Sequence, residues 1–305
     1  MQQVTSHVLM IRPSAFGYNV ETAKNNVFQH KPANGRVSDI TTQAIKEFDD
    51  FVQLLEKEGI HVTIIEDSQS PQKPDAVFPN NWISFHQDGT IITYPMFSKL
   101  RREERREEII QDLTQGFHVG QRIHFEIFEK HRQYLEGTGS MVLDRVNKVA
   151  YACISERTDP ELLNDWCQRM EFKPHTFHAM SNGIPIYHTN VMMAIGSKVA
   201  VVCLECLPDV SERTALLENL SMYHAVVEIT DAQVQSFAGN MLALKNGNEE
   251  ELMVMSARAL SSLTIEQKKE IEKYCRIVAS PIQTIEDVGG GSARCMIAEI
   301  FLEPK

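Results

Sequence analysis

The sequence predicts a single-domain α/β protein, residues 1–305, built as a five-bladed α/β propeller with pseudo-fivefold repeats. Five units of helix, strand and hairpin follow one another at a spacing of roughly 50 to 60 residues. A strand-like run, "HVLMIRP", precedes the first unit and has no hairpin of its own. The alternative is a doubly wound parallel sheet, but no glycine-rich phosphate loop opens a helix after an early strand.

The helix of each unit is indicated by apolar residues at positions i, i+3 and i+4. These patterns begin near Thr41, Ser98, Asp159, Asp209 and Thr264. Each is followed by a short run rich in β-branched and aromatic residues: "HVTIIE", "IHFEIF", "PHTFHA", "AVVEIT" and "RIVAS". We therefore expect a strand directly after each of the five helices.

A second strand follows in every unit after a loop. The five second strands are "NWISF", "SMVLD", "NVMMAI", "NMLAL" and "CMIAEI". In the first four units a third strand follows through a turn, as at the "DG" of "NWISFHQDGTIITYP". The fifth unit lacks its third strand, and "HVLMIRP" is free to supply it. This pairing would close the repeats into a ring and not leave them as a linear stack.

Composition and charge exclude several classes of binding partner and site. The formal net charge is -11 and the sequence pI is near 5.5, so the basic surface used for nucleic acid or anionic membranes is not expected. The N-terminus shows no signal peptide and no apolar run is long enough to span a membrane, which predicts a cytoplasmic protein. Six irregularly placed cysteines do not indicate a disulfide framework. We interpret the "CLEC" pair, Cys203 and Cys206, as strand-end packing, and we expect neither a metal nor an organic cofactor.

Polar side chains recur at the loop ends that enter the second strands. Because corresponding positions of a radial repeat meet around one axis, we expect them to line a common central pocket. These residues are Asp75, Asn80, Asn81, Glu136, His188, Asn190, Asn240 and Cys295. A thiol, an imidazole and a carboxylate are the groups that covalent thiol catalysis requires. Taken singly, each also has a structural interpretation: a packed cysteine, a core histidine and a turn glutamate.

Several motifs resemble those of a known superfamily. "EGTGSMVL" resembles a Glu-Gly-Gly-Asp segment, "CISERT" a Ser-x-Arg-Thr segment and "YHTN" a His-x-Asp segment, and the last cysteine follows glycines in "GGGSARC". The chain in this respect resembles the guanidine-modifying superfamily, the penteins, which includes arginine deiminase, dimethylarginine hydrolase and the glycine amidinotransferases. Within it, the citrulline utilisation hydrolases are the group it resembles most closely.

This resemblance implies a role for each matching residue. Cys295 would be the nucleophile and His188 the general acid and base, with Glu136 either holding a substrate nitrogen or orienting the imidazole. Arg157 would bind the substrate carboxylate through two parallel hydrogen bonds. Arg102 is the residue we expect to assist it, against the alternative that "KLRREERREE" is only a solvated helix face. The backbone N–H groups of Gly289 to Gly291 would serve a developing oxyanion.

Two asparagines determine the expected substrate. Asn81 and Asn190 stand where deiminases hold a guanidinium between aspartates, and an amide matches a neutral ureido group better than a carboxylate does. This predicts a small amino-acid substrate, citrulline, hydrolysed to ornithine, carbon dioxide and ammonia. The alternatives are arginine deiminase or dimethylarginine hydrolase activity, a non-catalytic propeller that serves as a binding module, and asparagines that only cap turns. The sequence leaves the oligomeric state open, a homodimer included.

Overall fold

Strands form the inner part of the fold. The computed structural model describes residues 1–32 and 37–305, and within this part the strands build five three-stranded sheets and one short hairpin. The sheets are β3 (Ile83–Phe85), β4 (Thr90–Thr93) and β5 (Gln121–His124); β6 (Val142–Asp144), β7 (Val149–Cys153) and β8 (Lys173–Phe177); β11 (Met193–Ile195), β12 (Val199–Val202) and β13 (Ala225–Glu228); β14 (Leu242–Lys245), β15 (Glu251–Ser256) and β16 (Arg276–Ser280); and β17 (Ala298–Ile300), β1 (His7–Arg12) and β2 (His61–Glu66). The hairpin is β9 (Met180–Ser181) and β10 (Ile184–Pro185).

All five sheets share one topology. The middle strand pairs antiparallel with the strand that enters from the central loops and parallel with the strand that follows the helix. The entering strands are β3, β6, β11, β14 and β17, and they correspond to the five predicted second strands. The predicted repeat of five units is therefore present in the structure.

The first strand of the chain completes the last sheet. In β1, His7 lies opposite Ile300 of β17 in an antiparallel pair and opposite His61 of β2 in a parallel pair. The prediction that "HVLMIRP" supplies the missing strand of the fifth unit is confirmed. Segments from the two ends of the sequence are thus joined in one sheet.

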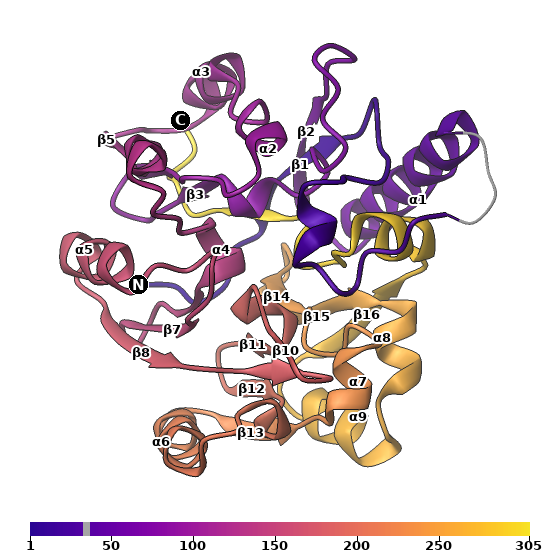
Figure 1. Cartoon of the computed structure of the whole chain (residues 1–305). Coiled ribbons are helices and arrows are strands. Elements are labelled where there is room, and N and C mark those ends of the chain that lie inside the picture. The colour runs from indigo at the N-terminus through magenta and orange to yellow at the C-terminus, as the bar shows by residue number, and fades with distance from the viewer. Residues whose placement is uncertain (33–36) are drawn as a thin grey trace.

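The helices lie outside the sheets, as Figure 1 shows for α1, α3, α5, α6 and α9. The helices are α1 (Val37–Lys57), α2 (Lys99–Arg102), α3 (Glu107–Gly116), α4 (Gly137–Ser140), α5 (Pro160–Met170), α6 (Val210–Ser221), α7 (Asp231–Val234), α8 (Ala257–Ser262) and α9 (Ile265–Glu272). Side chains of Asp159, Asp209 and Thr264 accept hydrogen bonds from backbone N–H groups at the starts of α5, α6 and α9. Such caps stabilise a helix by about 1 kcal/mol each, which explains why the sequence located these starts well.

Two predicted elements differ in extent. The single helix expected from Ser98 is divided into α2 and α3, and Arg101 and Glu104 form a buried ion pair there and do not lie on a solvated helix face. The strand expected in "IHFEIF" ends at His124, and the chain continues as the 3₁₀ helix η3 (Phe125–His131). Among the residues described, no helix combines the length and the apolar character that crossing a membrane requires.

Candidate active site

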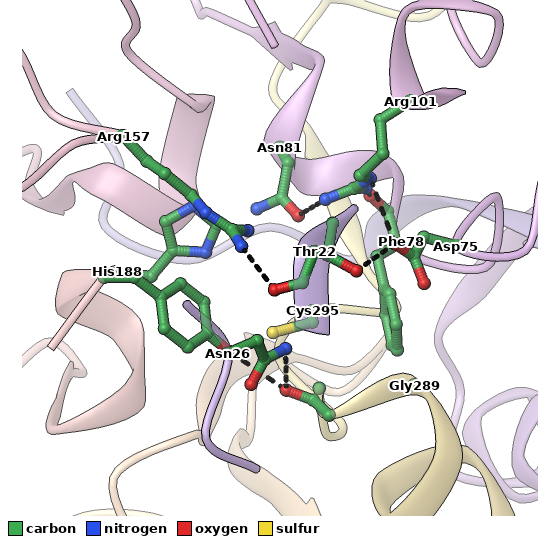
Figure 2. Close-up of a pocket in the computed structure, with 13 residues that line it drawn as sticks. Thr22, Asn26, Asp75, Phe78, Asn81, Arg101, Arg157, His188, Gly289 and Cys295 are labelled. Atoms are coloured by element: carbon green, nitrogen blue, oxygen red, sulfur yellow. Dashed lines mark hydrogen bonds and ion pairs between the residues drawn. The ribbon is translucent and has the colours of Figure 1, made fainter. Parts of the chain in front are cut away.

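A small cavity lies beside the loops that lead into the inner strands. Figure 2 shows Arg157 and Arg101 reaching it from opposite sides, with Asn81 between them and Cys295 below. The lining residues are Thr22, Asn26, Asp75, Phe78, Asn81, Arg101, Arg157, Tyr187, His188, Gly289, Gly290, Gly291 and Cys295. Five residues predicted from the loop ends and the motifs are therefore brought together: Asp75, Asn81, Arg157, His188 and Cys295.

The thiol of Cys295 is held between two asparagine amides. The Nδ2 of Asn240 lies 3.3 Å from the Sγ of Cys295, and the Nδ2 of Asn190 lies 3.7 Å from it. Cys295 is buried, and its backbone N–H donates to the carbonyl oxygen of Ser292 in the tight turn before β17. The Oδ1 of Asn240 also lies 3.6 Å from the sulfur, so the two amides fix the position of the thiol.

The imidazole of His188 is oriented by Glu136. His188 Nε2 lies 2.8 Å from Glu136 Oε2. Because a carboxylate only accepts, the neutral imidazole carries its proton on Nε2, and Nδ1 remains a base. Burial lowers the pKa of His188 to about 4, against the opposing effect of Glu136, so the ring is neutral at pH 7. A methyl group on Gly139 would lie 2.8 Å from Nδ1, so only glycine lets α4 pass this close to the ring.

Glu136 is fully occupied by protein groups. Its Oε1 accepts from the backbone N–H of Phe97 at 2.8 Å, and its Oε2 lies 3.5 Å from Arg157 Nη1 in addition to His188. Burial alone would raise the pKa of Glu136, but the charge of Arg157 and the hydrogen bond of His188 lower it to about 2. Glu136 does not line the cavity. Of its two predicted roles, the geometry favours orienting the imidazole over holding a substrate nitrogen.

Among the residues that the structure describes, three polar atoms of the cavity lining are buried without a hydrogen-bond partner: Asp75 Oδ1, Asn81 Nδ2 and Arg157 Nε. The Oδ2 of Asp75 accepts from Asn19 and Thr22, whereas its Oδ1 has no hydrogen bond. The Oδ1 of Asn81 accepts from Arg101 at 2.7 Å, which leaves its Nδ2 donor unpaired. Burial raises the pKa of Asp75, and the charge of Arg101 opposes this effect. One acceptor, on Asp75, and two donors, on Asn81 and Arg157, are therefore left for a ligand.

The arginine beside Asn81 is Arg101, and the prediction of Arg102 needs correction. Arg102 points away, donates to the backbone carbonyl of Met96 and pairs with Glu129 at 3.2 Å. Arg101 is buried, and its Nε and Nη2 each donate to one oxygen of Glu104 at 2.9 Å. Adjacent residues in α2 point in different directions, and the charge pattern of "KLRREERREE" does not reveal which one faces inward.

Two further expectations at the loop ends are corrected. Asn80 does not line the cavity: its Nδ2 lies 3.4 Å from Thr138 Oγ1. Asn190 contacts the sulfur of Cys295 but is likewise absent from the lining. Asn80 lies in the 3₁₀ turn η2 (Pro79–Asn81) and Asn190 in the 3₁₀ turn η4 (Thr189–Val191), and the side-chain nitrogen of each contacts another protein residue.

The far wall of the cavity comes from the N-terminal loop, which sequence reasoning missed. Arg157 Nη2 donates to the carbonyl oxygen of Thr22 at 3.3 Å and also contacts Asn25 Oδ1. Its guanidinium carbon lies 4.6 Å from the centre of the Tyr187 ring. The motif "YHTN" contains Tyr187, but the loop that includes Thr22 carries no repeat signal, because it lies outside the five units.

The glycine run shapes the cavity more through packing than through free N–H groups. Gly290 has φ of 65°, a left-handed conformation that favours glycine, and its N–H donates to the carbonyl oxygen of Glu286 at 2.9 Å. Its carbonyl oxygen accepts from Asn26 Nδ2 and Tyr187 Oη. The expectation that this run offers all its N–H groups to an oxyanion therefore fails at Gly290.

Within residues 1–32 and 37–305, no group of three or more His, Cys, Asp or Glu side chains is placed to hold a metal ion. The ionisable groups at the cavity can instead supply a sulfur nucleophile, a neutral imidazole base and carboxylates that pair with arginines. This is a set suited to nucleophilic attack on an electron-poor carbon.

Comparisons with known proteins identify the family of the chain. A family model described as N,N-dimethylarginine dimethylhydrolase, eukaryotic, matches residues 12–302. No curated protein sequence matches at a significant level.

Solved structures share the fold at low sequence identity. The apo structure of ArgZ, an arginine dihydrolase of the ornithine-ammonia cycle in Cyanobacteria, superimposes with a TM-score of 0.74 at 15% identity, covering 98% of this chain and 41% of that one. The substrate-bound N-terminal domain of ArgZ gives 0.71 at 14% identity, covering 97% and 99%. A dimethylarginine dimethylaminohydrolase variant, as an adduct with S-methyl-L-thiocitrulline, gives 0.65 at 14% identity, covering 97% and 100%. The chain thus spans less than half of full-length ArgZ and nearly all of its N-terminal domain.

Proposed function

Because the chain belongs to the eukaryotic N,N-dimethylarginine dimethylhydrolase family, we propose that it hydrolyses a guanidino C–N bond of an N-methylated arginine. Family membership makes the protein a hydrolase of non-peptide C–N bonds and a member of the pentein superfamily. We interpret the five sheets as the blades of an α/β propeller. The observation that carries the proposal is the meeting of Cys295, His188 and Asp75 at one buried cavity, with Glu136 bound to the imidazole of His188.

The charge balance of the cavity supports a cationic group. Arg101 is paired with Glu104, and Arg157 is paired with Glu136. Burial raises the pKa of Glu104 to about 7, yet the two 2.9 Å bonds from Arg101, one to each oxygen, fit its carboxylate form. Asp75 remains without an arginine of its own, since Arg101 Nε is 3.9 Å away. A substrate guanidinium would pair with Asp75 Oδ1. The positive charge of the guanidinium would counter the effect of burial on the pKa of Asp75.

The proposed reaction has two steps. Nδ1 of His188 accepts the thiol proton as the sulfur of Cys295 attacks the guanidinium carbon. The C–N bond to the methylated nitrogen breaks, and the imidazolium gives its proton to the departing amine. Water, deprotonated by the same neutral ring, then attacks the thiouronium carbon and releases the thiol. With dimethylarginine the products are citrulline and dimethylamine. The low pKa of His188 makes it a base first and an acid only after it has received this proton.

Arg157 is proposed to bind the substrate carboxylate. It lines the cavity, and its planar fork fits a carboxylate. In this structure its guanidinium contacts Thr22 and Asn25. A substrate carboxylate would replace these uncharged partners with a stronger, charged one.

Asn81 supports a second candidate, hydrolysis of a ureido group. Its Nδ2 is a buried donor without a partner, and a guanidinium offers it no acceptor, whereas the carbonyl oxygen of a ureido group does. This observation favours citrulline, with ornithine, carbon dioxide and ammonia as products. Asp75 fits the N–H groups of either substrate, so the two candidates differ in the group that faces Asn81.

A substrate panel tests both candidates. The protein is incubated separately with dimethylarginine, monomethylarginine, arginine and citrulline, and amines and amino acids are quantified over time, with Cys295→Ala as the control. We expect equal amounts of dimethylamine and citrulline from dimethylarginine, and none with the variant. Ornithine formed from citrulline alone would support the ureido candidate and overturn the guanidino proposal. No turnover of any of the four would reject both.

A further inference from the structure

A second cavity lies further along the same inner strands. Asn190 and Asn240 contact the sulfur of Cys295 just before β11 and β14, whereas Ala194 and Ala243 within these strands line the second cavity. The helix α4 separates the two spaces. Its Gly139 lies against His188, and its Thr138 lines the second cavity.

Two buried arginines and one carboxylate face this space. Arg145, Arg294 and Glu299 are 3%, 6% and 9% exposed, and all three line the cavity. Arg294 Nη2 donates to Glu299 Oε2 at 2.7 Å, and Nη1 donates to the backbone carbonyl of Ile297. One carboxylate thus serves two guanidinium groups, which leaves a buried excess of one positive charge.

Among the described residues, no carboxylate lies within hydrogen-bond distance of the guanidinium of Arg145. Its Nη2 lies 3.9 Å from Glu299 Oε1, which is too far for a hydrogen bond. Its Nη1 is 3.5 Å from Nδ1 of His86. Burial and the charge of Arg145 lower the pKa of His86 well below its usual value, so the ring is neutral. The adjacent carboxylate of Asp144 is bound by His224 and Asn147.

An unpaired buried cation is costly. The remaining contact of Arg145 is the face of the Phe301 ring, 4.0 Å from the guanidinium carbon. A cation–π contact of about 2 kcal/mol does not offset the removal of a full charge from water. An anion bound beside Arg145 would satisfy it, and Arg294 would attract the same anion.

We propose that this cavity is a second binding site, specific for a small monovalent anion of the size of a halide or formate. The cavity has a volume of about 30 Å³. This is roughly twice the space required by one ordered water and is too small for a large organic anion. The site is independent of the proposed reaction, because its charged residues do not line the cavity of Cys295.

Thermal unfolding at constant ionic strength tests the proposal. Sodium gluconate, too large to enter, is replaced stepwise by sodium chloride, bromide or formate. We expect Tm to rise and then saturate, because a ligand that binds only the folded state stabilises it by mass action. Arg145→Met should abolish the saturable rise. Arg169→Met, which removes an exposed arginine paired with Asp165, is the matched control and should retain it.

Two further measurements keep the proposal falsifiable if Arg145→Met does not fold. Ala194→Leu leaves the charges intact but fills the cavity, so it should also lose the saturable rise. Crystals of the wild-type protein grown with bromide should give an anomalous peak beside Arg145 and Arg294. A response to formate without one to halides would assign the site to small carboxylates. No bromide peak, together with equal anion responses in the wild type and Ala194→Leu, would overturn the proposal.

Discussion

Replacing Glu136 by glutamine removes one buried charge while keeping the shape of the side chain. Glu136 Oε2 accepts from His188 at 2.8 Å and lies 3.5 Å from Arg157. The proposed reaction requires His188 to become an imidazolium, which the carboxylate stabilises and an amide does not. Loss of one member of a buried charged pair typically costs 2 to 5 kcal/mol, and for this isosteric change we expect about 2 to 3 kcal/mol. This corresponds to a roughly 30- to 150-fold fall in kcat.

The pH profile separates this effect from a loss of structure. In the wild type, the neutral form of His188 accepts the thiol proton, so kcat/KM should be retained above pH 4 and fall as the pH drops through about 4. Glu136 raises the pKa of His188 against the effect of burial. The acid limb of Glu136→Gln should therefore move to lower pH, while the rate at pH 7 falls.

Glu104→Gln is the matched control. It also removes a buried carboxylate from an arginine, Arg101, but it does not touch His188. We expect Glu104→Gln to change KM and to leave the acid limb of the pH profile at the same pH as in the wild type. Initial rates of both variants from pH 3.5 to 8, with circular dichroism at each pH to monitor folding, provide the measurement. A fall in kcat of less than threefold in Glu136→Gln, or an acid limb that moves to higher pH, would refute the role of Glu136.

Substitutions at four other positions, Cys295, Arg101, Arg102 and Asn81, provide three further tests. Cys295→Ala and Cys295→Ser should fold and bind substrate yet lose essentially all turnover. Mass spectrometry of wild-type protein quenched during turnover should find the adduct on the peptide with Cys295. An active alanine variant would reject the assignment of Cys295 as the nucleophile. Arg101→Met should raise KM or impair folding, whereas Arg102→Met should change KM less than about threefold, since Arg102 pairs with Glu129 and does not line the cavity. Asn81→Asp should shift preference roughly tenfold from citrulline toward arginine, because a carboxylate pairs with a guanidinium; selectivity that stays constant would argue that Asn81 only holds Arg101.

The repeat made the fold readable from sequence. Caps at Asp159, Asp209 and Thr264 marked helix starts, and the second strands could be aligned with one another by their residues alone. The extent of one helix was predicted wrongly. An i,i+3 pair such as Arg101 and Glu104 is compatible with a continuous helix, so the charge pattern gives no sign of the break between α2 and α3.

The site was predictable where it follows the repeat or, for Arg157, a family motif. Cys295 and His188 occupy corresponding loop ends, so their meeting at one cavity could be anticipated. Thr22 and Asn26 come from a loop with no counterpart in the other units, and no periodic signal points to them. The preference for a neutral substrate rested on Asn81 and Asn190, but their contacts with Arg101 and with the sulfur depend on side-chain directions that sequence does not encode.

The sheet that joins β17 to β1 and β2 also sets the order in which the site can be assembled during synthesis. β1 is synthesised well before its partner β17, because most of the sequence lies between the two strands. Cys295 stands immediately before β17, so its thiol can settle between Asn190 and Asn240 only when this last pairing forms. The nascent chain therefore carries the proposed base and the two arginines of the cavity before it carries the proposed nucleophile, and the candidate site is complete only when β17 pairs with β1.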